Sequence, residues 1–318
     1  MSKDFRRGLH RKRLFYHFRV VGWTVMSAIW ALGAEEKSNN TPPNFTNYVQ
    51  HIPGTEASFE LVAIPGGTIT VGSPENEADR EPSDLPQKTV TIQPFWMGRY
   101  EIRWDAFMPF VFAEWDKTEV KEGEADGFTR PTKPYGSLFR EHGQDGHPAL
   151  GMSHFAATQF CKWLSVRTGL EFHLPTEAEW EYACRAGATT AYFWGNDAAQ
   201  ADSYGWFVDN SDLTTHPLGK KAPNKFGLYD MVGNLAEWCA PETDDGPRAA
   251  RGGAFTEPVT RLRCAARMID VPEWNALDPQ IPKSIWWLSS ADYVGIRVVR
   301  SLPDQTKTTA SSTAGGQP

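Results

Sequence analysis

The clearest periodic pattern in this chain predicts a helix over residues 154–167. Its apolar positions fall largely on one face, as expected for a helix that packs on a core, and they are Phe155, Phe160, Trp163, Leu164 and Val166. Ser153 directly before the segment is a typical N-cap residue, and Gly169 shortly after it is a typical end signal. The sequence therefore predicts both ends of this helix and its buried face.

A second, shorter helix is predicted over residues 177–185. Thr176 precedes it and Glu179 follows three residues later, which is the spacing of a capping box. Gly187 lies just beyond the last helical position and ends the segment. The sequence predicts these two helices and no others.

Short strands and loops are expected elsewhere. Residues 60–72 alternate between apolar and polar positions around a Gly-Gly pair, which predicts a pair of strands, and residues 89–92 predict another strand. An acidic, proline-containing loop separates them, and residues 117–147 indicate a long surface loop. Beyond Gly187 the pattern is one of short strands and Trp-bearing loops.

Composition supports one α+β domain with little regular secondary structure. The 318 residues, 40% hydrophobic and 22% charged, fit a soluble globular protein with a core. The 13 Trp, 27 Gly and 23 Pro residues favour a loop-rich fold held by aromatic side chains over a helix bundle. We place the domain at residues 57–302, between a polar linker over 35–56 and a tail over 303–318 that we expect to be disordered.

Residues 1–34 have the pattern of a secretory signal, with an uncleaved membrane anchor as the alternative. A stretch with seven Lys/Arg and one Asp contains the apolar run 20–32, which is shorter than the ~20 residues of a spanning helix. Either alternative makes the body extracytoplasmic (periplasmic, secreted or on the cell surface), and only an uncleaved N-terminus would contact a membrane. Because the chain has a net charge of −7 despite this basic start, its body is acidic, which argues against nucleic-acid binding.

Three stretches carry a resemblance to a known family. They are residues 173–187 (HLPTEAEWEYACRAG), 223–238 (PNKFGLYDMVGNLAEW) and 251–255 (RGGAF), and weaker matches extend from about Leu61 to Arg300. In this order and spacing they resemble the formylglycine-generating enzyme, or sulfatase-modifying factor, family. The resemblance implies a single α+β domain related to the C-type lectin-like fold, which agrees with the pattern above.

The resemblance also implies an oxidase whose catalytic cysteines this chain lacks. Family enzymes convert a cysteine within a Cys-x-Pro-x-Arg stretch of a sulfatase to formylglycine, using O₂ and copper held by two cysteines shortly after a Gly-Gly-Ser/Ala-Phe turn. Here residues 256–263 (TEPVTRLR) follow the turn and contain no cysteine. Ala254 stands in place of the turn serine, and Ala236 in place of an aromatic residue before Glu237. We therefore expect neither copper nor formylglycine generation.

The main hypothesis is an exported, non-oxidase binding module or pseudoenzyme of this family. Its partner would be a protein or peptide, with a sulfatase among the candidates, or a carbohydrate. The family's substrate cleft would be lined here by Ala254, Glu257, Arg261, Trp238 and Trp286. Two alternatives stay open: an oxidase on a protein cysteine or another oxidoreductase in the same cleft, using Glu257 and Arg261, and a structural component of the cell envelope.

The four cysteines carry separate expectations. By family position, Cys184 and Cys264 correspond to a structural disulfide. Cys161 matches a half-cystine whose usual partner is Val298 here, so we expect a buried thiol, and Cys239 has no assigned partner. Copper binding by Cys161 and Cys239 is an alternative that the sequence does not favour.

A structural calcium site is a further implication of the resemblance. The segment DMVGNLAE matches a family loop in which side-chain oxygens and backbone carbonyls converge on Ca²⁺. By position, Asp230 and Glu237 would supply side chains, and Gly233 and Leu235 would supply carbonyls. The alternative is a plain turn in which Asp230 caps the backbone and Glu237 pairs with an arginine.

Histidines and the last Trp pair complete the candidate residues. His147, His154, His173 and His216 are interpreted as packing and hydrogen-bonding residues rather than iron ligands, because the chain has no His-x-x-x-His pair. The pair formed by Trp286 and Trp287, just after the polar segment 278–283, would line a peptide or glycan groove or pack into the core. We expect at least one of the two in the core.

Overall fold

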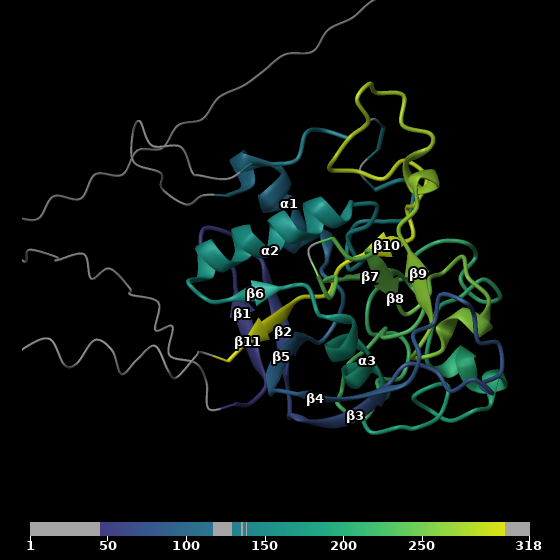
Figure 1. Cartoon of the computed structure of the whole chain (residues 1–318). Coiled ribbons are helices and arrows are strands. Elements are labelled where there is room, and N and C mark those ends of the chain that lie inside the picture. Colours follow the sequence, from purple (N-terminus) through teal and green to yellow (C-terminus); the bar gives the residue numbers. More distant parts are fainter. Residues whose placement is uncertain (1–44, 117–128, 135, 138, 244, 303–318) are drawn as a thin grey trace, which may run out of the picture. The chain divides into compact units, whose positions relative to one another are not determined.

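The computed structural model describes residues 45–116, 129–134, 136–137, 139–243 and 245–302. Within these ranges the fold is an α+β domain in which short strands and helices are joined by long loops (Figure 1). The expected N-terminal signal or anchor and the expected C-terminal tail lie outside the described residues. No helix in the described part is long and apolar enough to cross a membrane.

A five-stranded antiparallel sheet joins the start and the end of the domain (Figure 1). Its strands, in spatial order, are β1 (Tyr48–His51), β2 (Ser58–Ile64), β5 (Phe95–Gly98), β11 (Val299–Ser301) and β6 (Phe172–His173). The last strand, β11, pairs with β5 on one side and β6 on the other. The last strand of the described domain is therefore inserted between two strands that precede it in the sequence.

A second sheet holds the sequence motifs. Its strands, in spatial order, are β10 (Val294–Gly295), β7 (Ala236–Cys239), β8 (Ala249–Arg251) and β9 (Arg267–Ile269), and only the β10–β7 pair is parallel. A separate antiparallel pair consists of β3 (Gly67–Val71) and β4 (Lys88–Ile92). Because β8 ends directly before the Gly-Gly-Ala-Phe turn, this sheet positions the turn that the sequence singled out.

The described residues also contain three α-helices and four 3₁₀ helices. The α-helices are α1 (Trp104–Val111), α2 (His154–Thr168) and α3 (Glu177–Arg185), and the 3₁₀ helices are η1 (Ala113–Trp115), η2 (Ala198–Ser203), η3 (Val259–Leu262) and η4 (Pro272–Asn275). In Figure 1, α2 lies beside β6 with α1 on its other side, and α3 packs against β3 and β4.

Both predicted helices are confirmed, together with their ends. The Ser153 hydroxyl accepts a hydrogen bond from the Ala156 N–H at 3.1 Å, and Gly169 ends α2 in the left-handed region with φ 68°. Thr176 and Glu179 form the complete capping box at the start of α3. Local sequence therefore suffices to define these helix ends.

The predicted burial along α2 was partly wrong. Phe155 and Val166 are 36% and 65% exposed, whereas Phe160, Trp163 and Leu164 are fully buried. The buried positions of α2 run from its first turn to its last and are Ala156, Ala157, Phe160, Cys161, Trp163, Leu164 and Thr168, so Phe155 and Val166 are the two predicted members that are not buried.

The helix α1 was not predicted. It has only eight residues and contains Pro109, which removes a backbone donor and is unfavourable inside a helix. Seven of the eight residues are nevertheless buried, and the Phe107 ring packs against the rings of Phe110, Phe160 and Trp287. Tertiary packing therefore stabilises a helix that local propensity does not favour.

One strand prediction and one domain boundary need correction. The strands predicted around the Gly-Gly pair exist as β2 and β3, but β2 pairs with β1 and β5, and β3 pairs with β4. A Cβ on Gly66 would lie 2.8 Å from Pro94, so the chain passes too close to its neighbour there for a side chain. The domain also begins before residue 57, because β1 within the expected linker 35–56 is paired with β2.

Candidate functional site

The Gly-Gly-Ala-Phe turn is a tightly packed backbone crossing. Gly252 and Gly253 have φ values of 97° and 69°, and a Cβ on Gly253 would lie 2.9 Å from the carbonyl oxygen of Arg261. Ala254 and Phe255 are both buried in the main core. The sequence analysis predicted that Ala254 lines the cleft, but this residue is completely buried.

The segment after the turn, where the family carries its cysteine pair, holds an acidic loop instead. It contains η3, and the buried guanidinium of Arg263 donates through Nη1 to Glu77 at 2.7 Å and to Asp84 at 2.8 Å. A guanidinium that bridges two carboxylates from one loop fixes that loop against the segment.

Two further arginines, Arg261 in the segment after the turn and Arg267 in β9, contact the acidic loop that contains Glu77 and Asp84. Arg261 forms ion pairs with Glu81 and, at 3.4 Å, with Glu257, and Arg267 donates to the carbonyl oxygen of Ser83 at 2.9 Å. Glu257 and Arg261, which the sequence offered as an alternative reactive pair, are therefore paired with one another. Burial raises the pKa of Glu257 and lowers the pKa of Arg261.

The two Trp residues predicted to line the cleft lie in the core. Trp238 is fully buried and its indole N–H donates to the carbonyl oxygen of Met152 at 3.0 Å. Trp286 is 4% exposed and packs on Phe155, with ring centroids 4.9 Å apart. The cleft assembled from sequence position is therefore wrong in its aromatic members, because these large rings pack against their neighbours on α2 and η4.

All four cysteines are buried thiols. Burial raises the pKa of Cys161, Cys184 and Cys239, so none of these thiols favours the thiolate form that Cu(I) binding requires. Cys184 and Cys264 lie next to one another as predicted, with their sulfurs 3.3 Å apart, but no bond joins them. The disulfide therefore stays a prediction, and the expected buried thiol at Cys161 is confirmed.

The proposed calcium loop contains a cluster of buried carboxylates. Glu237 accepts hydrogen bonds on both oxygens from Arg297, at 2.7 to 3.0 Å, and on one oxygen from the Trp180 indole N–H at 2.7 Å. Asp230 accepts from the Gly219 N–H at 2.7 Å, while its Oδ1 is buried without a partner. Burial raises the pKa of Asp230 to about 6.

Part of this donor set is already engaged, because both oxygens of Glu237 accept hydrogen bonds from Arg297. Among the described residues, no group of three or more acidic, His or Cys side chains is placed to hold a metal ion. Glu237 pairs with Arg297, as the alternative interpretation of this loop expected, and Gly233 has a left-handed backbone with φ 70°. The unpartnered oxygen of Asp230 is the one observation in favour of a cation, so calcium stays a hypothesis.

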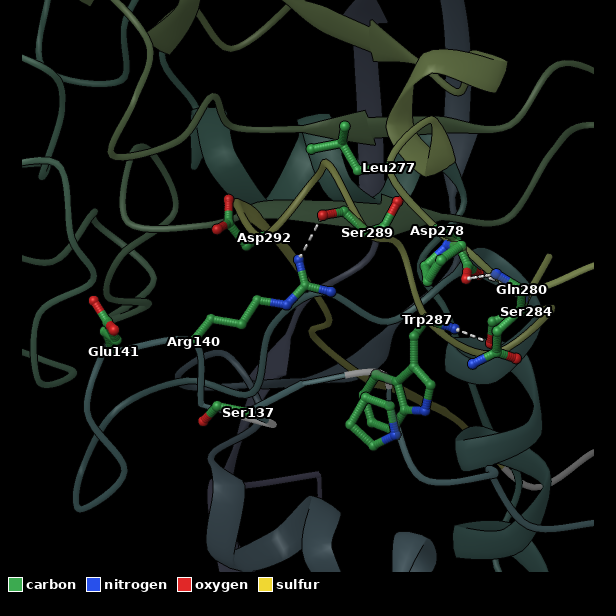
Figure 2. Close-up of a pocket in the computed structure, with 12 residues that line it drawn as sticks. Ser137, Arg140, Glu141, Leu277, Asp278, Gln280, Ser284, Trp287, Ser289 and Asp292 are labelled. Carbon is green, nitrogen blue, oxygen red and sulfur yellow. Dashed lines mark hydrogen bonds between the residues drawn. The ribbon is translucent and has the colours of Figure 1, made fainter.

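One candidate site is a pocket of about 370 Å³ between two loops (Figure 2). One side of the pocket is formed by Pro134, Ser137, Arg140 and Glu141, and the other by the loop over residues 277–292. Trp287 forms an apolar wall, and its indole N–H donates to the carbonyl oxygen of Thr132 at 2.6 Å. Both adjacent Trp residues are 4% exposed and belong to the main core, and Trp287 also lines the pocket.

Arg140 braces the pocket wall. Figure 2 shows its side chain extended toward Ser289, whose carbonyl oxygen accepts from Nη1 at 3.4 Å, and its Nη2 donates to the carbonyl oxygen of Leu288. Arg140 and Glu141 both have left-handed backbones, with φ values of 46° and 70°. Two adjacent non-glycine residues in this region indicate strain, which is often found at ligand sites.

Carboxylates outnumber cations in this pocket. Asp278 accepts from the backbone N–H groups of Gln280 at 2.9 Å and Ser284 at 2.6 Å, which folds its loop, while Glu141 and Asp292 stand at the rim. The three carboxylates face one guanidinium, that of Arg140, so the pocket is acidic. Such a pocket favours a ligand with a positive charge.

The pocket reaches the Gly-Gly-Ala-Phe turn through His142. The His142 Nε2 lies 3.4 Å from the Asp292 carboxylate, and the His142 ring packs on the Phe255 ring with centroids 5.0 Å apart. The hydrogen bond from His142 lowers the pKa of Asp292, which keeps that carboxylate ionised. The pocket therefore adjoins the turn from which the family's active site is built.

The histidine predictions are confirmed. His147 pairs with the Thr215 hydroxyl at 2.9 Å, His154 with the carbonyl oxygen of Cys239 at 3.1 Å, and His173 with the Ser301 hydroxyl at 2.9 Å. His216 lies flat on Trp206 with ring centroids 3.7 Å apart. Each of these rings has a structural role.

Sequence reasoning missed the pocket residues Arg140, Glu141 and Asp292. Residues 117–147 were interpreted as one long surface loop, and nothing in their pattern indicates which of them fold back on the domain. The polar segment 278–283 beside the Trp pair was the one available signal, since it supplies Asp278 and part of the second loop.

Known proteins match this chain over most of the described domain. The sequence profile of the sulfatase-modifying factor enzyme 1-like domain matches residues 50–278. The formylglycine-generating enzyme of Thermomonospora curvata is 26% identical over 309 residues, covering 74% of this chain and 96% of that enzyme. A serine/threonine-protein kinase, pkn1 of Chlamydia pneumoniae, is 29% identical over 230 residues, but the match spans only 35% of the kinase.

Solved structures agree with the sequence comparison. The structure of PvdO from Pseudomonas aeruginosa is 28% identical, has a TM-score of 0.59, and matches along its full length to 80% of this chain. The Treponema denticola variable protein 1, at 21% identity and a TM-score of 0.58, shares the fold. Because the matched profile covers well over half of the sequence, the chain belongs to the sulfatase-modifying factor enzyme 1-like family, that of the formylglycine-generating enzymes.

Proposed function

We propose that this protein is a non-oxidase member of its family that acts by binding a protein or peptide ligand. The observation that carries the proposal is the fate of the segment after the Gly-Gly-Ala-Phe turn. Residues 256–263 contain no cysteine, and Arg261 and Arg263 of this segment, together with Arg267 of β9, hold an acidic loop there. The sulfurs of Cys184 and Cys264 lie next to one another, but both are completely buried and burial raises the pKa of Cys184, so this pair does not favour the thiolate form that binds Cu(I).

The acidic pocket supports the binding half of the proposal. It is lined by Trp287, by carboxylates and by Leu277, which is 76% exposed. The loop that carries Leu277 also contains the exposed side chains of Ile281 (99%) and Ile285 (59%). Aliphatic contacts beside a charged pocket are features of a surface that receives an extended segment of another protein.

A different chemistry through Glu257 and Arg261 has less support. The two side chains form an ion pair with one another, and Arg261 also pairs with Glu81 of the acidic loop. Export of the domain remains our proposal from residues 1–34, which lie outside the described residues.

Mass spectrometry tests the loss of oxidase activity. The purified protein, supplied with copper and O₂, is incubated with a Cys-x-Pro-x-Arg peptide, and the Thermomonospora curvata enzyme serves as the positive control. We expect aldehyde formation by the control alone. Aldehyde formation by this chain, or stoichiometric copper that tracks with turnover, would contradict the proposal.

Peptide display tests the binding half. A random peptide library is selected on the protein, and the affinity of enriched peptides is measured by fluorescence anisotropy. Asp292→Lys in the pocket rim should weaken them at least tenfold, whereas Glu171→Lys, the same charge reversal at an exposed position outside the pocket, should leave them unchanged. Peptides that bind both variants equally would show that the pocket is not the binding site.

A further inference from the structure

A hydroxyl group, an imidazole ring and a carboxylate form a hydrogen-bonded chain beside the acidic pocket. The Thr214 hydroxyl lies 3.0 Å from His142 Nδ1, and a carboxylate oxygen of Asp292 lies 3.4 Å from His142 Nε2. Thr214 and Asp292 are 72 and 150 positions away from His142 in the sequence, so the fold brings the three groups together. In this order they have the arrangement of a nucleophile, a general base and a group that orients the base.

Contacts around His142 hold its ring in one orientation. The Phe255 ring packs on it with centroids 5.0 Å apart, and the His142 backbone N–H donates to the carbonyl oxygen of Phe139 at 2.8 Å. Because the hydrogen bond with His142 lowers the pKa of Asp292, this carboxylate is ionised and accepts from Nε2. With its proton on Nε2, the neutral ring presents Nδ1 as an acceptor for the proton of the Thr214 hydroxyl.

Thr214 follows directly on a strained turn. Asp212 and Leu213 both have left-handed backbones, with φ values of 54° and 56°. The Thr214 N–H donates to the carbonyl oxygen of Ser211 at 3.2 Å, which closes the turn. Non-glycine residues in this region are unfavourable, and such strain is found at functional sites. Thr214 itself is partly exposed, which leaves it open to a ligand.

Other contacts between a hydroxyl and an imidazole in this domain differ from that of Thr214. Thr215 is buried and its hydroxyl donates to a backbone carbonyl oxygen, so its proton is not available to His147, 2.9 Å away. The Ser301 hydroxyl contacts His173, but the other nitrogen of that ring faces the carbonyl oxygen of Leu174 rather than a carboxylate. These two contacts therefore stabilise the fold without activating a hydroxyl.

We propose that Thr214 is the nucleophile of a site that hydrolyses carboxylic esters. The Thr214 oxygen attacks the acyl carbon and forms a C–O bond, while the hydroxyl proton passes to His142 Nδ1. The C–O bond to the leaving alcohol then breaks, and the departing oxygen takes the proton from Nδ1. A water molecule attacks the acyl-threonine by the same route, which releases the acid and restores the hydroxyl. Asp292 stabilises the imidazolium in both steps.

The acidic pocket indicates a cationic ester as the substrate. Asp292 belongs to both the pocket and the hydrogen-bonded chain, and Glu141 in the pocket wall directly precedes His142. A positively charged group bound beside these carboxylates therefore keeps the rest of its molecule close to Thr214. The reaction needs neither copper nor a thiol, so it is independent of the loss of oxidase activity.

A fluorophosphonate probe tests the nucleophile. An activated hydroxyl displaces fluoride from phosphorus, and peptide mapping by mass spectrometry identifies the residue that carries the new P–O bond. With the full-length protein we expect the label on Thr214. Thr214→Ser should retain the label and Thr214→Val should abolish it, while His142→Gln and Asp292→Asn should each reduce labelling at least tenfold. Thr189→Val, at an exposed threonine outside the pocket of Figure 2, should change nothing.

A pair of chromogenic esters tests the substrate class. The nitrophenyl esters of aminohexanoic and hexanoic acid differ in one terminal ammonium group and share a leaving group. We expect kcat/KM to be at least tenfold higher for the cationic ester, and we expect Thr214→Val to abolish the hydrolysis of both esters above background. Equal values for the two esters would overturn the assignment of a cationic substrate.

Two results would overturn the nucleophile. They are the absence of a label on Thr214 and labelling that both His142→Gln and Asp292→Asn leave unchanged. Thermal melting establishes that each variant is folded, and the comparison of Thr214→Ser with Thr214→Val decides the question should the variants of His142 or Asp292 not fold. Thr214→Val should bind selected peptides like the wild type, so a failure here is distinct from a failure of the proposed binding function.

Discussion

Arg297 donates hydrogen bonds to both carboxylate oxygens of Glu237, and both side chains are almost completely buried. The other donors of Arg297 reach the carbonyl oxygens of Gly98, Tyr229 and Asp230 at 2.8 to 3.2 Å. One guanidinium therefore ties β10 and the strand that follows it to the loop from which the candidate calcium ligands come.

Removal of one partner of this ion pair should destabilise the domain strongly. Glu237→Gln leaves the buried cation of Arg297 without its counter-charge, and we expect a loss of about 3–5 kcal/mol in the free energy of unfolding. Urea unfolding followed by Trp fluorescence measures it. The matched control is Glu60→Gln, which breaks the more exposed pair with Arg99 (44% and 33% exposed) and should cost less than about 1 kcal/mol. Equal costs would show that the buried pair has no special role.

The calcium hypothesis predicts a dependence of the melting temperature on the metal. A cation that binds only the folded state at 100 times its Kd stabilises it by about 2.7 kcal/mol, so EDTA should lower the Tm by several degrees. Asp230→Asn should reduce that difference. It removes the charge but keeps a side chain that tolerates the left-handed φ of 53° at this position. A Tm that EDTA leaves unchanged would establish the loop as a turn held by Arg297 alone.

The free energy of unfolding should decrease as the pH is lowered through the titration range of His154. Burial lowers the pKa of this residue from 6.5 to about 4. Between these values the unfolded state binds more protons than the folded state, so the free energy of unfolding decreases as the pH falls from about 7 to 4, by up to roughly 3 kcal/mol. His154→Gln should flatten this part of the profile, measured by urea unfolding at each pH. His51→Gln, at an exposed position, should retain the wild-type slope.

Oxidation should join Cys184 and Cys264. Their sulfurs are 3.3 Å apart and 80 residues separate them, so a bond would close a long loop and contribute roughly 4 kcal/mol in the chain-entropy model. Thiol counting by alkylation and mass spectrometry should find two free thiols in the oxidised protein and four after reduction. Cys264→Ser should be costly mainly under oxidising conditions, whereas the effect of Cys161→Ser should not depend on the reductant. Four free thiols after oxidative folding would refute the disulfide.

Much of the fold could be predicted because its signals are local. The N-cap at Ser153, the capping box of Thr176 and Glu179, and the strand over 89–92 depend on residues a few positions apart, and all three are confirmed. The motif order also identified the family, and with it the α+β domain. The sequence did not predict the helix α1 or the correct partners of β2 and β3, because these features depend on contacts between residues that are distant in sequence.

The candidate site divides in the same way. The sequence by itself determined that residues 256–263 contain no cysteine, since the identity of a residue does not depend on the fold. Only the tertiary structure decided that Trp238 lies in the core, that Glu257 and Arg261 pair, and that loops from two distant parts of the chain form the pocket. Such sites arise from packing between segments more than a hundred residues apart, and no local pattern of side chains specifies which loops meet.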